Sequence, residues 1–314
     1  MAVEARGEAA TATRRRTSPD VDVVIVSYRC RDLLQRCLAS VERHAPPGTS
    51  TWVVDNASRD GTVELVRERF PETRLIANDE NVGFSIANNL AIRRGTAPYV
   101  LVLNPDCELR HGTLPALLRI MESNPGVGIA GCRLERADGS FDHASRRSFP
   151  TLAGALGHFT GVGRLLRGGP LAQYRAPEVE RGPVDAVNGA FMLLRRAALE
   201  AVGLFDERYW LYMEDLDLCY RMNRAGWATW YEPGVTALHV KHGAADRRRS
   251  PRLVVAFHRS MWRFYRSHYA SARLAPRDDV VLAGIVVKTL GGVLASAALA
   301  LVDRVRSPAP SADG

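Results

Sequence analysis

Residues 21–55, VDVVIVSYRCRDLLQRCLASVERHAPPGTSTWVVD, contain the alternation that decides the fold. The apolar, β-branched run at 21–27 predicts a buried strand, and the leucines within 32–43 recur at helical spacing. Residues 46–48, Pro-Pro-Gly, break the chain before a second strand at 51–54. A strand, a helix and a second strand in this order are typical of one unit of a parallel sheet.

The same alternation continues along the chain. Further helices are expected at 62–70 and 84–94, and further strands at 74–77, 98–103, 184–194 and 227–231, while residues 235–240 lead to His239 and His242. We therefore predict an α/β fold with a doubly wound, mostly parallel sheet. Ligands of such sheets bind at the carboxyl ends of the strands, where this sequence has Ser27-Tyr28, Asp55 and Asp106.

The composition is that of a globular protein. Of 314 residues, 46% are hydrophobic and 24% are charged, which excludes a disordered chain, a collagen-like chain and a polytopic membrane protein. The net charge of +8 would suit nucleic acid, anionic lipid or phosphorylated substrates. Because no nucleic-acid-binding motif accompanies this charge, nucleic acid is not an expected partner. Five cysteines without a Cys-x-x-Cys pair predict reduced thiols.

Two common nucleotide-binding loops are missing from the sequence. The first predicted strand is followed by Ser27-Tyr28-Arg29-Cys30 and not by Gly-x-Gly-x-x-Gly, which argues against a dinucleotide-binding oxidoreductase. The sequence also has no Gly-x4-Gly-Lys-[Ser/Thr] loop, so a P-loop enzyme is not expected.

The two ends of the chain differ in character. Residues 1–19 predict a disordered basic tail and not a signal peptide, because no apolar segment follows the arginines at 14–16. Residues 280–302 contain a single charge, Lys288, and as a helix would be long enough to cross a bilayer. This segment could lie in the membrane surface or re-enter it, could span the membrane, or could pack on the soluble body.

The segment before it, residues 257–269, alternates aromatic residues with arginines on a predicted helix. Such a helix suits a lipid headgroup layer, and it equally suits a protein surface with its aromatic residues in the core. The expected organisation is a tail at 1–19, a catalytic domain at 20–245, membrane-proximal helices at 246–303 and a disordered tail at 304–314.

An acidic cluster, Glu214-Asp215-x-Asp217, opens a predicted helix beside Trp210 and Tyr212. Acids at a helix start favour the helix dipole, which is a purely structural reason for them. A carboxylate beside bulky apolar groups can instead have a raised pKa and act as a general base.

Two more candidates follow predicted strands. Asp106 lies in a tight turn with Asn104 and Pro105, and could cap that turn or project into a cleft. His239 could be a core histidine or a metal ligand. Together with the acidic cluster, these residues suggest a site for a divalent cation and a diphosphate, where a base deprotonates an incoming hydroxyl.

Six motifs in order resemble the family 2 glycosyltransferases of the GT-A fold, over residues 21–245. They are Val-Ile-Val-Ser27-Tyr28, Val-Val-Asp55-Asn56-Ala-Ser58, Asn81-x-Gly83-Phe84, Leu-Asn104-Pro105-Asp106, Asn188-Gly189-Ala190-Phe191 and Glu214-Asp215-x-Asp217. The Asn-Pro-Asp variant and the aromatic–arginine helix look most like bacterial rhamnosyltransferases that act on polyprenyl-diphosphate-linked N-acetylglucosamine. The resemblance implies a GT-A nucleotide-sugar-binding domain with a C-terminal helical, membrane-associated extension.

The resemblance also implies roles by position. It assigns donor binding to Ser27, Tyr28, Asp55, Gly83, Asn104 and Asp106. It assigns a divalent cation, Mg²⁺ or Mn²⁺, to Asp106 and His239, and the base to Asp215 with Glu214 as its neighbour. Acceptor contacts are expected from Trp210, Glu214, Arg259 and Arg263. One departure is Arg29, which stands where the family often has Asn.

The activity implied is that of an inverting glycosyltransferase. It would move L-rhamnose from dTDP-rhamnose onto the lipid-linked acceptor at the cytoplasmic face of the bacterial membrane, as a peripheral or re-entrant protein. A homodimer stays open. The alternatives are a UDP-hexose or furanose donor, or a non-catalytic nucleotide-sugar-binding scaffold of the cell envelope. The presence of Asp55, Asp106, Asp215 and His239 argues against the scaffold.

Overall fold

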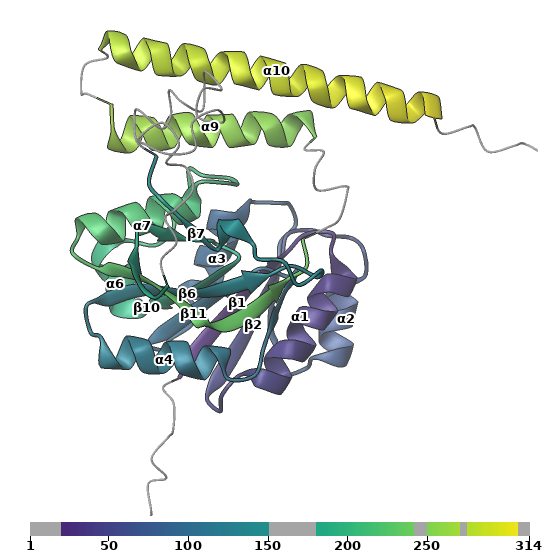
Figure 1. The fold of residues 1–314 in the computed structure, drawn as a ribbon. Helices are drawn as coiled ribbons and strands as arrows, with labels where there is room; N and C mark the ends of the chain where they lie inside the picture. Colours follow the sequence, from purple (N-terminus) through teal and green to yellow (C-terminus); the bar gives the residue numbers. More distant parts are fainter. Residues whose placement is uncertain (1–19, 151–179, 242–249, 271–274, 307–314) are drawn as a thin grey trace, which may run out of the picture.

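The computed structural model describes residues 20–150, 180–241, 250–270 and 275–306. An α/β body carries two long helices, α9 (Pro251–His268) and α10 (Pro276–Arg306), on one side (Figure 1). The tail predicted at 1–19 lies outside the described residues, as do residues 307–314 of the second tail. Residues 304–306 of that tail belong to α10.

The body is built on one large sheet with strand order β3-β2-β1-β4-β10-β6-β11-β5, and β8 pairs with β11. The strands are β1 Val21–Ser27, β2 Thr49–Asp55, β3 Arg74–Ala77, β4 Tyr99–Leu103, β5 Cys107–Leu109, β6 Val127–Glu135, β8 Gly182–Val184, β10 Phe191–Arg195 and β11 Ala228–His239. Strands β1 to β4 are parallel, β10 is antiparallel to β4 and β6, and β11 is parallel to β6. The predicted mostly parallel sheet is confirmed.

Helices cover both faces of this sheet, because successive side chains of a buried strand point to opposite sides. Val23 and Ile25 pack with the helices of one face, whereas Val24 packs with those of the other. The first face carries α1 (Arg31–His44), α2 (Thr62–Arg69) and α4 (Thr113–Ser123). The second carries α3 (Phe84–Ile92), α6 (Arg196–Val202) and α7 (Glu214–Arg224).

Two predicted strand boundaries are wrong. The single strand expected at 184–194 is interrupted by a turn, because Asn188 Oδ1 accepts the N–H of Ala190 and the chain reverses before β10. The residues before the turn form β9 (Ala186–Val187), which pairs with β7 (Arg146–Arg147) in a separate ribbon. Conversely, the strand expected at 227–231 is longer: β11 runs from Ala228 to His239, with a shift in register between Glu232 and Thr236.

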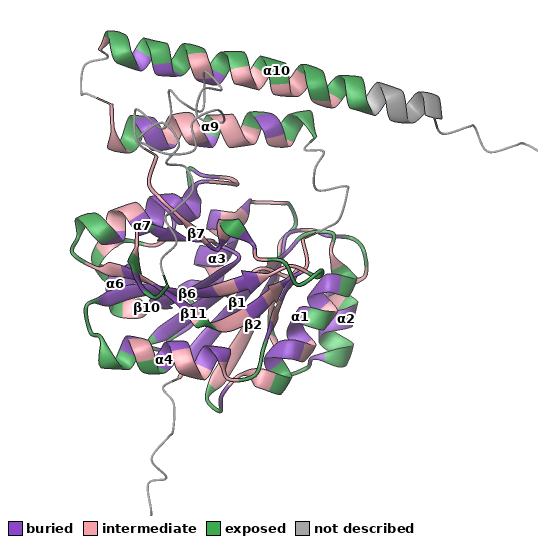
Figure 2. Cartoon of the chain, viewed as in Figure 1, coloured by how far each residue is buried: buried purple, intermediate pink, exposed green. Residues whose placement is uncertain are grey.

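Helix α9 lies between the body and α10 (Figure 1). Its Phe264 is buried in the apolar cluster that contains α7, and its Tyr265 packs against Val281 and Ile285 of α10. Much of α10 is exposed (Figure 2). Its exposed apolar side chains are Val280, Leu282, Val286, Val287, Leu290, Leu294 and Leu299. Residues 276–299 are long and apolar enough to cross a membrane.

Candidate active site

Asp215 is held at the first turn of α7 by groups from three elements. Its Oδ2 accepts the N–H of Gly189 at 2.8 Å and a hydrogen bond from the guanidinium of Arg147. Its Oδ1 accepts the N–H of Leu216 at 2.7 Å. A Cβ on Gly189 would lie 3.1 Å from the Cβ of Asp215 and 3.2 Å from its Oδ2, so a side chain there would crowd the carboxylate. The turn that interrupts the predicted strand therefore positions the predicted base.

Glu214 differs from its neighbour. It is buried, and its Oε2 has no hydrogen-bond partner within the described part of the chain. Burial and the adjacent charge of Asp215 raise the pKa of Glu214 well above its ordinary value. The two preceding residues, Tyr212 and Met213, have left-handed φ values of 71° and 70°, a conformation that side chains rarely adopt. This turn immediately precedes Glu214 and Asp215, and so it sets where the first turn of α7 places their carboxylates.

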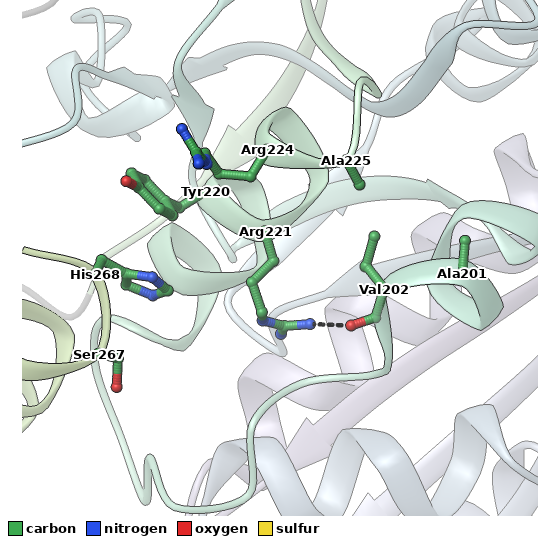
Figure 3. Close-up of a pocket in the computed structure, with 8 residues that line it drawn as sticks. All are labelled: Ala201, Val202, Tyr220, Arg221, Arg224, Ala225, Ser267 and His268. Carbon is green, nitrogen blue, oxygen red and sulfur yellow. Dashed lines mark hydrogen bonds between the residues drawn. The ribbon is translucent and has the colours of Figure 1, made fainter. Parts of the chain in front are cut away.

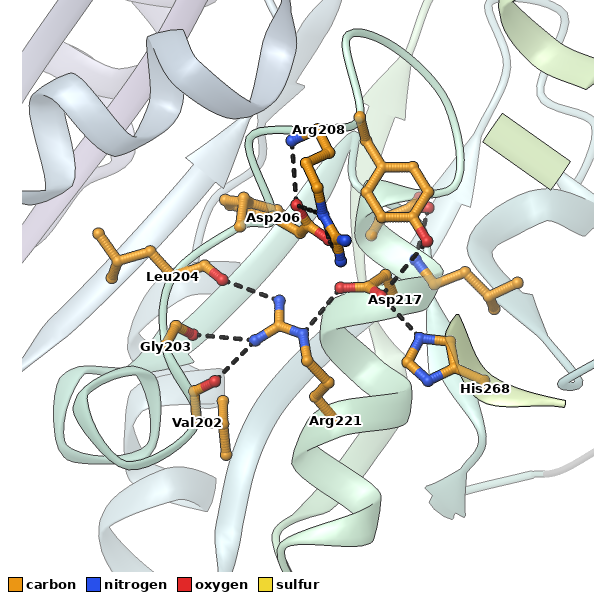
Figure 4. Close-up of polar contacts among 12 residues, drawn as sticks. Val202, Gly203, Leu204, Asp206, Arg208, Asp217, Arg221 and His268 are labelled. Atoms are coloured by element: carbon orange, nitrogen blue, oxygen red, sulfur yellow. Dashed lines mark hydrogen bonds and ion pairs between the residues drawn. The ribbon is translucent and has the colours of Figure 1, made fainter. Parts of the chain in front are cut away.

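Asp217, the third acid of the cluster, has a structural role (Figure 4). Its side chain is 2% exposed and accepts hydrogen bonds from Arg221 Nε at 2.8 Å and His268 Nε2 at 2.7 Å. Arg221 also donates to the carbonyl oxygens of Val202, Gly203 and Leu204. Asp217 therefore ties α7 to α9 and to the loop after α6.

A cavity of about 620 Å³ opens beside this network, between α6, α7 and the end of α9 (Figure 3). It is lined by Ala201, Val202, Tyr220, Arg221, Arg224, Ala225, Ser267 and His268. None of these belongs to the predicted site, so we do not place a substrate there.

Asp106 and His239 meet as predicted. His239 ends β11, which pairs with β5, and its Nε2 lies 3.5 Å from Asp106 Oδ2. Its Nδ1 donates to Asp142 Oδ2 at 2.9 Å, and Lys241 donates to the other oxygen of Asp142. Burial lowers the pKa of His239, but its contacts with Asp106 and Asp142 outweigh this and raise it to about 9.

These residues fit a divalent cation. Potential ligand atoms of Asp106, Cys107 and His239 all lie within 4.8 Å of one another. Burial raises the pKa of the Cys107 thiol well above its ordinary value, which makes its thiolate the costliest of these ligands to form. The imidazole of His239 would give up its proton on binding a cation, and Asp106 is accessible enough for a phosphate to approach.

Tyr28 and Asp55 follow adjacent strands, as predicted for a nucleotide site. The Tyr28 ring is 44% exposed, and the guanidinium of Arg29 lies over it at 5.2 Å. Asp55 accepts the N–H of Ser58 through Oδ2, whereas its buried Oδ1 has no partner among the residues described. Asp55 also lines a cavity of about 300 Å³, so a carboxylate that lines a cavity and a partly exposed tyrosine lie at one edge of the sheet.

Two residues predicted to bind the sugar donor, Ser27 and Gly83, have other neighbours in the structure. Ser27 is completely buried, and its Oγ is 3.3 Å from Cys30 Sγ, so its side chain does not face a ligand. Gly83 packs against Trp210: its φ is 89°, and a Cβ there would lie 2.5 Å from the Trp210 carbonyl oxygen. Close approach to Trp210 therefore accounts for this glycine. Asn104 donates its N–H to Ala190 O and so joins the Asn-Pro-Asp turn to the turn before β10.

The predicted acceptor residues lie on or beside α9. Residues 209–212, which lead into α7, each contact this helix. Two contacts are cation–π: Arg263 lies over the Tyr209 ring, and Arg252 lies over the Trp210 ring. In the other two, Ser260 donates to Leu211 O at 3.0 Å, and Phe257 packs on Tyr212. Arg263 is therefore engaged with Tyr209, whereas Arg259 is exposed.

The sequence did not identify Asp142 and Arg147, which contact His239 and Asp215. Both lie in a stretch without hydrophobic periodicity, and their partners are 97 and 68 residues away. No local pattern could have indicated either contact.

Comparison with known proteins identifies the family of this chain. The profile described as "Glycosyl transferase family 2" matches residues 22–203. An N-acetylglucosaminyl-diphospho-decaprenol L-rhamnosyltransferase of Mycobacterium tuberculosis is 33% identical over 268 residues, covering 81% of this chain and 86% of the relative. Rhamnosyltransferase WbbL of Escherichia coli is 31% identical over 168 residues, covering 51% of this chain and 61% of that protein.

A solved structure shares the fold. Mannosyltransferase PcManGT from Pyrobaculum calidifontis, in complex with GDP-Man and Mn²⁺, has a TM-score of 0.57 and covers 94% of this chain and 78% of its own. At 18% identity this likeness shows the fold alone. The predicted GT-A fold is confirmed, and the chain belongs to glycosyl transferase family 2.

Proposed function

We propose that this chain is an inverting glycosyltransferase that moves L-rhamnose from dTDP-rhamnose onto polyprenyl-diphosphate-linked N-acetylglucosamine in cell-wall polysaccharide synthesis. The observation that carries the proposal is the arrangement of Asp215, the Asp106–His239 pair and Asp55 around one sheet. A base, a cation site and a nucleotide site are the parts that sugar transfer needs. Similarity to the Mycobacterium tuberculosis enzyme supports this donor and this acceptor.

In the proposed reaction, Asp215 accepts the proton of an acceptor hydroxyl as its oxygen attacks the anomeric carbon of rhamnose. The new C–O bond forms on the face opposite to the bond that breaks, so one displacement inverts the configuration and releases dTDP. Asp106 and His239 would hold a divalent cation, Mg²⁺ or Mn²⁺, which would offset the charge of the departing diphosphate. Tyr28 and Asp55 would bind the base and ribose of the nucleotide.

A donor panel tests the proposal. The purified protein is incubated with a short-chain polyprenyl-diphosphate N-acetylglucosamine and, separately, dTDP-rhamnose, UDP-hexoses and a furanose donor, and products are identified by mass spectrometry. We expect a disaccharide from dTDP-rhamnose. A product from a UDP-hexose or furanose alone would contradict the choice of donor. Binding of nucleotide sugars without any product would favour the non-catalytic scaffold.

We also propose that α9 and α10 hold the protein at the cytoplasmic face of the membrane, as a peripheral protein. The acceptor lipid stays in the bilayer, so the site must reach the membrane surface. Helix α10 carries exposed apolar side chains and is backed by α9 over the part that runs from Val281 to Gly292, and Arg259 and Arg266 of α9 are exposed. A helix with one apolar side exposed and the other packed on protein suits the membrane surface.

Charges on the exposed side of α10 test this placement. Val287 and Leu294 are 68% and 70% exposed, so replacing both with Glu leaves the contact with α9 intact. We expect Val287→Glu/Leu294→Glu to lose co-sedimentation with phosphatidylglycerol vesicles and transfer to long-chain acceptor, and to retain activity on a short-chain acceptor. The control is Arg67→Glu, an exposed site on α2. Unchanged co-sedimentation of the double variant would contradict the proposal, as would a wild-type dimer that dissociates on these substitutions.

A further inference from the structure

Arg147 contacts the proposed base directly. Its guanidinium donates to Asp215 Oδ2 and, at 3.3 Å, to the carbonyl oxygen of Val187. The pairing of β7 with β9 sets Arg147 opposite Ala186 and so brings it beside the first turn of α7. Its side chain is 19% exposed, so it is not sealed from solvent.

This contact opposes the function of a base. The guanidinium occupies Asp215 Oδ2, one of the two carboxylate oxygens that could otherwise accept the proton of a hydroxyl. The other two donors, the N–H groups of Gly189 and Leu216, belong to a turn and a helix that fix their positions. Arg147 is a flexible side chain, so it is the contact that a substrate can remove.

We propose that Arg147 makes Asp215 responsive to the acceptor diphosphate. In the substrate-free protein Arg147 pairs with Asp215, and when the lipid-linked acceptor binds, the guanidinium moves to a phosphate oxygen and leaves Asp215 free to take the hydroxyl proton. No covalent bond changes in this exchange. The inference rests on the proposed function, because it takes the acceptor to be a diphosphate.

The chemistry of the two anions supports the exchange. A guanidinium binds phosphate through parallel hydrogen bonds, and a diphosphate carries more charge than one carboxylate. Arg221 is engaged with Asp217 and three carbonyl oxygens and Arg263 with the Tyr209 ring, whereas Arg259 is exposed; Arg147 is the arginine that contacts Asp215. The exchange would also restrain Asp215 from activating water while no acceptor is present.

Arg147→Gln tests this against Arg146→Gln. Arg146 is the adjacent residue of β7, and its guanidinium lies over the rings of Phe141 and Tyr231. Two quantities are measured for each protein: hydrolysis of dTDP-rhamnose without acceptor, and kcat/KM for a short-chain prenyl-diphosphate N-acetylglucosamine relative to a neutral alkyl N-acetylglucosaminide.

For Arg147→Gln we expect faster hydrolysis and a loss of about tenfold or more in the preference for the diphosphate acceptor, since one charge-assisted hydrogen bond is removed. Arg146→Gln should change neither. Equal losses on both acceptors without faster hydrolysis would overturn the proposal and leave Arg147 as a support for Asp215. If Arg147→Gln does not fold, Arg147→Lys replaces it, because it keeps the charge and loses the fork. A wild-type protein that transfers to neither acceptor would refute the proposed function, while the hydrolysis rates would still decide whether Arg147 restrains Asp215.

Discussion

Asp215→Asn is expected to lower the turnover of rhamnose transfer by about 10²- to 10⁴-fold, the contribution of a positioned general base. The amide cannot take the hydroxyl proton, yet its oxygen can still accept the N–H of Gly189 or Leu216. Binding of dTDP-rhamnose should survive, because Tyr28, Asp55 and Asp106 lie on other elements. Turnover is measured with the lipid-linked acceptor, and donor affinity by calorimetry.

Asp206→Asn is the matched control. It removes a carboxylate from the loop before α7 that pairs with Arg208 and does not touch Asp215. Its turnover should stay within a few-fold of the wild-type value. Turnover of Asp215→Asn within the same range would show that the base lies elsewhere, and Glu214, which is adjacent and buried, would then be examined next.

The sheet and the edge that carries the site were predictable because each depends on local pattern. Buried β-branched runs and helical spacing of leucines specify the strands and helices, and parallel strands present their carboxyl ends at one edge. Tyr28, Asp55 and Asp106 lie at this edge because β1, β2 and β4 are parallel and adjacent. The turn at Asn188-Gly189 carried its own signal, a dipeptide typical of turns, which the apolar residues around it obscured.

Which residue at the end of a strand is exposed was not predictable, because alternation places neighbours on opposite sides without saying which side is open. Ser27 and Tyr28 are adjacent, yet one is buried against Cys30 and the other is open to solvent. The reason for Gly83 was also not visible in the sequence, because Trp210, the residue that requires it, lies on a loop that is distant along the chain. The three acids of the cluster look equivalent in the sequence, and only tertiary packing makes Asp217 a tie to α9 and Asp215 a candidate base.

Removal of divalent cations is expected to abolish transfer. Asp106 and His239 supply two ligands, and the donor diphosphate would complete the site. Without a cation, the negative charge that develops on departing dTDP faces the carboxylate of Asp106 uncompensated. Activity in excess EDTA should fall to background, and Mg²⁺ or Mn²⁺ should restore it. Full activity in excess EDTA would contradict the assignment.

The contact of His239 with Asp142 allows a second test, in which the affinity for the cation is weakened and not abolished. Nδ1 of His239 donates to Asp142, which turns Nε2 toward Asp106. Partners of this kind fix the orientation of a metal-binding histidine, and their loss typically costs about 10- to 100-fold in metal affinity. Asp142→Asn should therefore weaken Mn²⁺ binding, measured by calorimetry with dTDP present, by that factor.

Asp138→Asn, exposed in the neighbouring turn at 136–140, should leave Mn²⁺ affinity unchanged. Because Asp142 also accepts from Lys241 and from the N–H of Ala144, its substitution could act by loosening the turn at 142–145 instead of by turning the imidazole. Lys241→Met separates the two effects, since it removes a partner of Asp142 and leaves His239 in place. If Lys241→Met weakens Mn²⁺ binding as much as Asp142→Asn does, the turn as a whole holds the site and the orientation of His239 does not decide the affinity.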